Sequence, residues 1–87
     1  MRKIHCSDHL EIMVIEALQQ ANIEFTHESE NKVQGLDFCL TGQNIYIEVK
    51  RYHSDRTVNQ LTAHDNIILL QGIEAVRLFT KLITKAI

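Results

Sequence analysis

Two carboxylates and a lysine near the middle of the chain have the types and spacing that suit metal-assisted hydrolysis. Asp37 precedes Glu48, and Lys50 follows Glu48 by two positions. Apolar and other residues alternate on both sides of Gly42-Gln43, a pattern typical of two β-strands joined by a tight turn. With Gly42 and Gln43 as a two-residue type II′ loop, Asp37 lies directly opposite Glu48, and their Cβ atoms are roughly 5 Å apart. Lys50 then points to the same face of the hairpin.

An opposed carboxylate pair needs a compensating charge, because like charges directly across two strands destabilise a sheet. A divalent cation such as Mg²⁺ or Mn²⁺ supplies that charge when one or two carboxylates hold it and leave room for water and phosphate. Asp37 and Glu48 are therefore candidate metal ligands, and Lys50 is a candidate to orient or deprotonate a water molecule. The alternative is a plain amphipathic hairpin, with a cross-strand ion pair between Lys50 and Asp37.

This hairpin resembles the active-site signature of the PD-(D/E)XK nuclease superfamily, an Asp followed at a distance by Glu-x-Lys. The predicted order of elements is similar to the α-β-β-β-α-β core of its smallest members, the VRR-Nuc group and archaeal Holliday-junction resolvases. One departure is that Leu36 stands where the family has Pro. The resemblance implies catalytic roles for Asp37, Glu48 and Lys50. It also implies a Mg²⁺ or Mn²⁺ cofactor bound by Asp37, Glu48 and the carbonyl of Val49.

Two more catalytic candidates follow from the same resemblance. In resolvase-like members a Glu early in the first helix faces the metal, which corresponds to Glu11 here, with Glu16 as the competing residue. Glu11 also has a local reason to be present, since Asp8 and Glu11 form a capping box at the start of that helix. Gln60 resembles a glutamine that contacts DNA or bound water in several branches. Its alternative role is that of a surface residue on a short helix.

Basic residues follow the signature directly. Arg51, His53 and Arg56 are candidate nucleic-acid-binding residues, and the alternative is a solvated basic loop. The net charge of −2 argues against a nucleic-acid partner, because domains that bind nucleic acids are usually basic. A metal-dependent nuclease concentrates acids at its centre, however, so the total charge understates the local field.

Length and composition limit the remaining classes of protein. Eighty-seven residues predict one domain, residues 1–87. No apolar run approaches the roughly 20 residues of a membrane span, and none follows the basic N-terminus as in a secretory signal. Two cysteines, Cys6 and Cys39, do not make a disulfide framework, which favours reduced thiols and a cytoplasmic location. The absence of a glycine-rich phosphate loop argues against a nucleotide cofactor.

A second cluster with metal-like spacing occurs at the N-terminus. His5, Cys6 and His9 all offer ligand atoms. A structural zinc site needs four ligands, and the other candidates are scattered along the chain. We therefore expect a frayed N-terminus rather than a zinc site.

The first half of the chain predicts one helix and one strand before the hairpin. The helix runs from Asp8 to a stop at Asn22, with a buried stripe at helical spacing. Ile12 and Ile15 fall off this stripe and would be exposed on an isolated helix, so we expect them to meet either another element or another subunit. A strand over residues 23–28 follows, with Ile23 and Phe25 pointing inward. The buried stripe of the helix consists of Leu10, Met13, Val14, Ala17, Leu18 and Ala21.

The second half predicts a short helix over residues 54–64, a strand over residues 66–70 and a last helix after Gly72. The apolar run of this strand is typical of a strand covered on both faces. The whole order predicts an α/β fold with one mixed sheet flanked by helices. The buried stripe of the last helix is expected to consist of Ala75, Val76, Phe79, Leu82, Ile83 and Ala86.

These inferences favour a metal-dependent DNA endonuclease of a phage or mobile-element type, working as a homodimer, with branched or junction DNA among its candidate substrates. The first alternative is a non-catalytic nucleic-acid-binding or assembly subunit that retains the nuclease fold. A small α/β interaction protein with a chance motif is the second. Asp37, Glu48 and Lys50 argue against the first alternative, because a subunit without catalysis has no need of a repulsive carboxylate pair.

Overall fold

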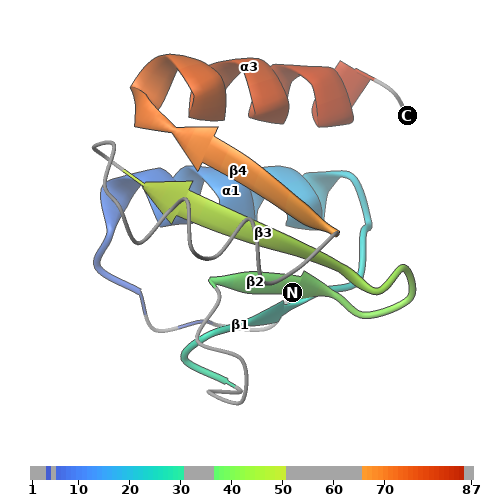
Figure 1. The fold of residues 1–87 in the computed structure, drawn as a ribbon. Helices are drawn as coiled ribbons and strands as arrows, with labels where there is room; N and C mark the ends of the chain where they lie inside the picture. The colour runs from blue at the N-terminus through green and yellow to red at the C-terminus, as the bar shows by residue number, and fades with distance from the viewer. Residues whose placement is uncertain (1–3, 5, 31–36, 51–65, 86–87) are drawn as a thin grey trace.

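A mixed sheet of four strands, in the order β1-β2-β3-β4, runs through the described part of the chain (Figure 1). The computed structural model describes residues 4, 6–30, 37–50 and 66–85. The pairs β1–β2 and β2–β3 are antiparallel, whereas β3 and β4 are parallel. The predicted α/β class with one mixed sheet is thereby confirmed. The elements are α1 (His9–Gln20), β1 (Thr26–His27), β2 (Phe38–Leu40), β3 (Ile45–Lys50), β4 (Ile67–Gln71) and α3 (Gly72–Lys85).

Both ends of α1 are fixed by interactions that its sequence specifies. The Asp8 carboxylate accepts a hydrogen bond from the Glu11 amide at 3.0 Å, the expected N-cap. Asn22 adopts a left-handed conformation with φ 56°, and the amide of the next residue donates to the carbonyl of Leu18. This is the Schellman arrangement, in which a left-handed residue ends a helix. The predicted stop at Asn22 is confirmed.

The hairpin of β2 and β3 has the predicted register but a different turn. Gln43 donates its amide to the Leu40 carbonyl at 3.0 Å, and the left-handed residue is Asn44, with φ 52°, not Gly42. The type II′ assignment is therefore wrong. Residues 41–44 form a longer loop, and Asn tolerates the left-handed region. The register survives because Phe38, Cys39 and Leu40 still pair with Ile47, Tyr46 and Ile45.

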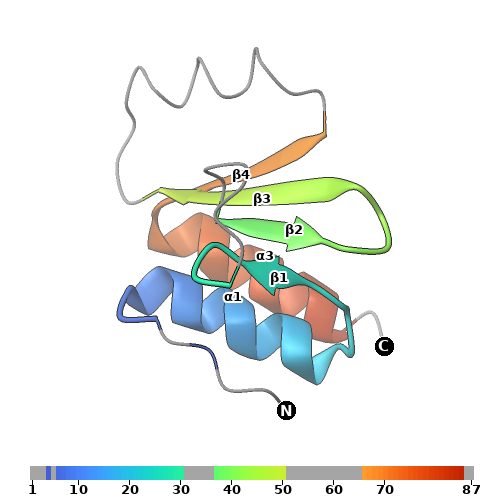
Figure 2. The same cartoon turned by 90° about the horizontal axis from the view of Figure 1, so that it is seen from below.

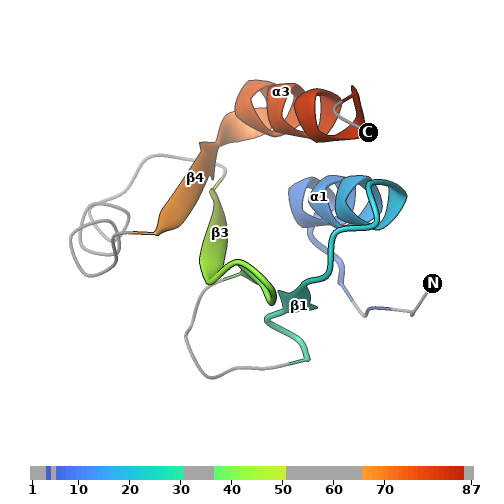
Figure 3. The same ribbon diagram turned by 90° about the vertical axis from the view of Figure 1, so that its right-hand side faces the viewer.

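Both described helices cover the same face of the sheet and lie beside each other (Figures 2 and 3). The hydrophobic core fills the space between this helical layer and the sheet. Neither helix is long and apolar enough to cross a membrane, within the described ranges. The largest fully buried side chains come from α1, β2, β3 and α3 and are Val14, Leu18, Phe38, Ile47 and Val76.

The structure decides between the two alternatives for Ile15, the off-stripe residue of α1. Ile15 is 7% exposed and belongs to the core, so it meets other elements of the same chain and is not available for a subunit contact. Ile12 is half-buried. Ile15 lies one turn after Glu11, which contacts His27 of β1, and it is not among the α1 residues that line the groove with α3, so the buried face of α1 extends toward β1.

Three other expectations need correction. The first strand is limited to Thr26–His27 instead of residues 23–28, although Phe25 is buried as predicted. In β4, Leu70 is buried but the preceding residues are half-buried, so this strand is not fully covered on both faces. In α3, Leu82 is 58% exposed, because it lies about 120° around the helix from the buried Val76.

Candidate functional site

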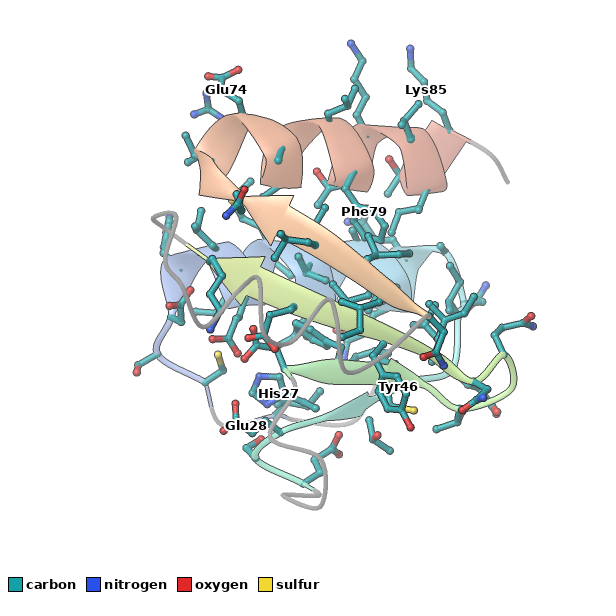
Figure 4. The ribbon with its side chains drawn as sticks, in the orientation of Figure 1. His27, Glu28, Tyr46, Glu74, Phe79 and Lys85 are labelled. Carbon is teal, nitrogen blue, oxygen red and sulfur yellow. The ribbon has the colours of Figure 1, made fainter. Side chains whose placement is uncertain are left out.

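Side chains that can bind a metal or take part in catalysis meet at one end of the sheet. His27 ends β1 and Asp37 directly precedes β2. Glu48 and Lys50 lie near the C-terminal end of β3. Since these three strands are neighbours with antiparallel pairing, the end of β1, the start of β2 and the end of β3 lie together. The first turn of α1 reaches the same place, and Figure 4 shows the His27 ring beside a group of carboxyl oxygens.

Asp37 and Glu48 form a buried carboxylate pair, as the hairpin register predicted. Their exposed fractions are 7% and 3%. The Val49 amide donates to Asp37 Oδ2 at 2.7 Å. The Asp37 carboxyl group thus takes the place of the backbone carbonyl acceptor that a neighbouring strand would otherwise supply. A further hydrogen bond joins the two carboxyl groups. The N–H and C=O of one strand residue point to the same neighbour, so the Val49 carbonyl also faces this end.

The environment raises the pKa of Asp37 from 3.8 to about 8. Burial is the largest cause, because it penalises the charged form, and the nearby charges of Glu48 and Glu11 add to it. The hydrogen bond from Val49 acts in the opposite direction. Near neutral pH the Asp37 carboxyl group is therefore largely protonated.

Lys50 shares the face of the carboxylate pair. Its Nζ lies 3.2 Å from Glu48 Oε1, and the lysine side chain is 23% exposed. The ion pair thus forms along β3, instead of across the strands to Asp37 as the alternative interpretation had it. Ile47 and Val49 alternate with these residues and point into the core, as predicted.

The structure brings Glu11, not Glu16, to this end of the sheet. The Glu11 side chain is 16% exposed, and its charge acts on Asp37. Glu16 is exposed and lines a groove between α1 and α3 together with Lys81. Burial raises the pKa of Glu11, although a hydrogen bond to His27 opposes the rise.

Two residues at the site were not identified from the sequence. His27 is only 5% exposed, and its Nε2 lies 2.7 Å from Glu11 Oε1. Cys6 places its Sγ 4.0 Å from the same oxygen, instead of lying in a frayed N-terminus. Burial raises the pKa of the Cys6 thiol. The alternation that places Phe25 inward also places His27 inward, so a signal for His27 was present. The sequence marked Cys6 as a possible ligand beside His5 and His9, but not as a neighbour of Glu11.

The donor set at the carboxylate pair fits a hard divalent cation. Asp37 and Glu48 offer oxygen ligands from two adjacent strands, and Glu11 is close enough for its charge to act on Asp37. Oxygen ligands are what Mg²⁺ and Mn²⁺ prefer. A bound cation would also offset the burial and the repulsion that together raise the pKa of Asp37.

The remaining predicted site residues lie outside the described residues. They are Gln60, Arg51, His53 and Arg56, together with the helix expected over residues 54–64. Comparisons of the chain with protein-family models, curated proteins and solved structures find no match.

Proposed function

We propose that this protein is a Mg²⁺- or Mn²⁺-dependent endonuclease that hydrolyses phosphodiester bonds in DNA. The observation that carries the proposal is the buried carboxylate pair of Asp37 and Glu48, which has Lys50 on its own face. Two acids from neighbouring strands, both more than nine-tenths buried, are costly to a fold unless a cation offsets their charge. The resemblance of the same three residues to the PD-(D/E)XK signature gives the reaction class.

Each residue of the site has a proposed role in binding the cation or the phosphate. Asp37, Glu48 and the Val49 carbonyl hold the cation, and Glu11 adds a fourth oxygen ligand directly or through water. When bound, the cation neutralises charge on the phosphate and lowers the pKa of a coordinated water. Lys50 pairs with Glu48 and is half-exposed, so its ammonium group can also reach a phosphate or an attacking water.

Hydrolysis then requires that a water oxygen form a bond to phosphorus while a P–O ester bond breaks. Lys50 orients the water by hydrogen bonding and offsets the negative charge that builds on the phosphate oxygens. Positions on β3 suit this task, because strand residues are held more rigidly than loop residues. The basic residues Arg51, His53 and Arg56 follow directly in sequence and are proposed to contact the DNA backbone.

A cleavage assay with matched lysine variants tests the proposal. Junction, flap, duplex and single-stranded DNA are incubated with wild-type protein, Lys50→Ala or Lys85→Ala, in Mg²⁺, Mn²⁺ or EDTA. Lys85 is exposed in the last turn of α3 and serves as the control. We expect cleavage only with metal, and a rate that is lower by on the order of 10²–10⁴ for Lys50→Ala alone. Equal rates for the two variants reject the role of Lys50, and a wild-type protein that cuts none of the DNAs rejects the endonuclease.

One observation favours the second candidate, an assembly subunit that retains the nuclease fold. Ile73, Leu78 and Leu82 of α3 are 41%, 59% and 58% exposed, which is apolar surface that a partner would cover. The same surface serves the homodimer that we propose for the endonuclease. Metal-dependent cleavage separates the two candidates, because an assembly subunit would associate through α3 without cutting DNA.

A further inference from the structure

Three side chains from separate parts of the chain bring their ligand atoms together beside the carboxylate pair. Cys6 precedes α1, Glu11 lies in its first turn and His27 ends β1. One ligand atom from each lies within 4.8 Å of the other two. We call Cys6, Glu11 and His27 the thiol cluster.

The members of the thiol cluster are held by the fold and are not loosely placed. The backbone of His27 pairs with Phe38 in the sheet, and the two rings pack edge to face with centroids 5.0 Å apart. Glu11 is fixed by the N-cap bond from its amide to Asp8. Cys6 Sγ lies 3.8 Å from the carbonyl oxygen of Asp8, so the thiol is tied to the same cap.

The chemistry of this donor set differs from that of the carboxylate pair. One sulfur, one nitrogen and one oxygen are the ligands that zinc-like ions accept, whereas Mg²⁺ prefers oxygen alone. Around a tetrahedral zinc-like ion, neighbouring ligand atoms are roughly 3.3–3.6 Å apart, given bond lengths of about 2.0–2.3 Å. The present separations are 2.7 Å from His27 to Glu11 and 4.0 Å from Cys6 to Glu11. Small changes in the side-chain torsion angles would therefore bring the three ligand atoms to the separations that a tetrahedral ion requires.

We propose that the thiol cluster binds a zinc-class divalent ion through Cys6 Sγ, Glu11 carboxylate oxygen and His27 Nε2. With three protein ligands, a fourth position is left for water, as in catalytic rather than structural zinc sites. The site shares Glu11 with the oxygen-ligand site of the proposed function, and its other two ligands are different residues. It stands whether or not the protein cleaves DNA.

The second ring nitrogen of His27, which would not bind the ion, has a hydrogen-bond partner in Ser29. In the structure the Ser29 amide donates to His27 Nδ1 at 3.1 Å, so the ring proton lies on Nε2 and is donated to Glu11. An ion at Nε2 replaces this proton and requires the other tautomer, in which Nδ1 carries the proton and no longer accepts from the Ser29 amide. Ser29 Oγ lies 2.8 Å from Nδ1 and can accept a proton placed there. Histidine ligands are commonly oriented by such a second hydrogen bond.

Cobalt spectroscopy tests the site without any reference to nuclease activity. Reduced full-length protein is treated with EDTA, exchanged into buffer and titrated with Co²⁺, which substitutes for zinc and absorbs in the near ultraviolet when a thiolate binds it. Cys6→Ser should abolish the thiolate band, while Cys39→Ser, a matched change at the other free thiol, should preserve it. His27→Gln should weaken Co²⁺ binding roughly 10-fold or more, and Zn²⁺ should displace Co²⁺ from the wild type.

The outcomes distinguish this site from the proposed function. A thiolate band that depends on Cys6 supports the site, including in Asp37→Asn, where the proposed nuclease site is disabled. A wild-type protein with no thiolate band, or a band lost with Cys39 instead of Cys6, overturns the site. Because Cys6 precedes α1 and is half-buried, Cys6→Ser is expected to fold even if the buried His27→Gln does not, and circular dichroism checks both.

Discussion

The buried carboxylate pair should give the metal-free protein an unusual dependence of stability on pH. Asp37 has a pKa of about 8 in the folded protein and near 3.8 in the unfolded chain. Between these values the folded state binds more protons than the unfolded state, so the free energy of unfolding falls as pH rises. Stability from this group is fully present below about pH 4 and is lost as pH rises through 8. Paired surface carboxylates give the opposite sign.

The size of the effect is large for a domain of this length. Each pH unit within the window is worth up to about 1.4 kcal/mol for one proton, so the whole window amounts to on the order of 5 kcal/mol. Small domains have total stabilities of roughly 5–15 kcal/mol. Glu11, whose pKa is also raised by burial, contributes in the same direction. The metal-free protein should therefore be clearly less stable at pH 8 than at pH 5.

Asp37→Asn isolates the contribution of the pair. The amide oxygen of Asn can still accept from the Val49 amide, and its NH₂ group can donate to Glu48, so both hydrogen bonds survive without the second charge. We expect the stability advantage of the variant over the wild type to grow steadily from pH 5 to pH 8, by several kcal/mol across that range. Glu74→Gln, a change at an exposed acid on α3, should leave the profile unchanged.

Urea denaturation in EDTA, followed by circular dichroism at pH 5, 6, 7 and 8, measures these free energies. The decisive comparison is the difference between Asp37→Asn and the wild type at each pH. If the wild type becomes more stable from pH 5 to pH 8, or if Asp37→Asn is the less stable protein at pH 8, the reasoning about the pair is refuted.

Three further predictions concern metal binding and assembly. Mn²⁺ should raise the melting temperature of the wild type but not of Asp37→Asn, because a ligand stabilises only the state that binds it; equal rises would contradict the assigned ligand. Glu11→Gln should weaken Mn²⁺ binding in calorimetry by roughly 10-fold or more, whereas Glu16→Gln should not, and equal affinities would remove Glu11 from the site. Leu82→Lys should convert a dimer into a monomer in sedimentation, and a wild type that is monomeric at high concentration rules out the α3 contact.

The sequence predicted the geometry of the carboxylate pair because that geometry depends on short-range rules. Strand alternation and a short loop leave few registers, so Asp37 and Glu48 were placed opposite each other even though the turn type was wrong. Asn44, not Gly42, takes the left-handed conformation, yet the pairing of Leu40 with Ile45 is the same. Register is specified by which face is buried, and the details of the loop are secondary.

What the sequence could not predict depends on how elements meet in space. Ile15 is buried one turn after Glu11, on the side of α1 that contacts β1, and the spacing of α1 marks it as off the stripe without saying what it meets. The thiol cluster likewise joins Cys6, Glu11 and His27 through the docking of α1 against the short β1. Each of the three carried some signal in the sequence, but none of these signals joined them in one cluster.

The hydrogen bond from Val49 to Asp37 affects which substitutions at position 37 can accumulate during evolution. An Asn at position 37 keeps that bond and removes a buried group that can ionise, so a single substitution favours the fold at the expense of cation binding. A lineage released from the need for metal should accumulate such stabilising changes early, since nothing in folding opposes them. Sequences related to this chain can therefore be sorted by position 37: those that keep Asp there, opposite Glu48, retain a residue that stability alone would remove.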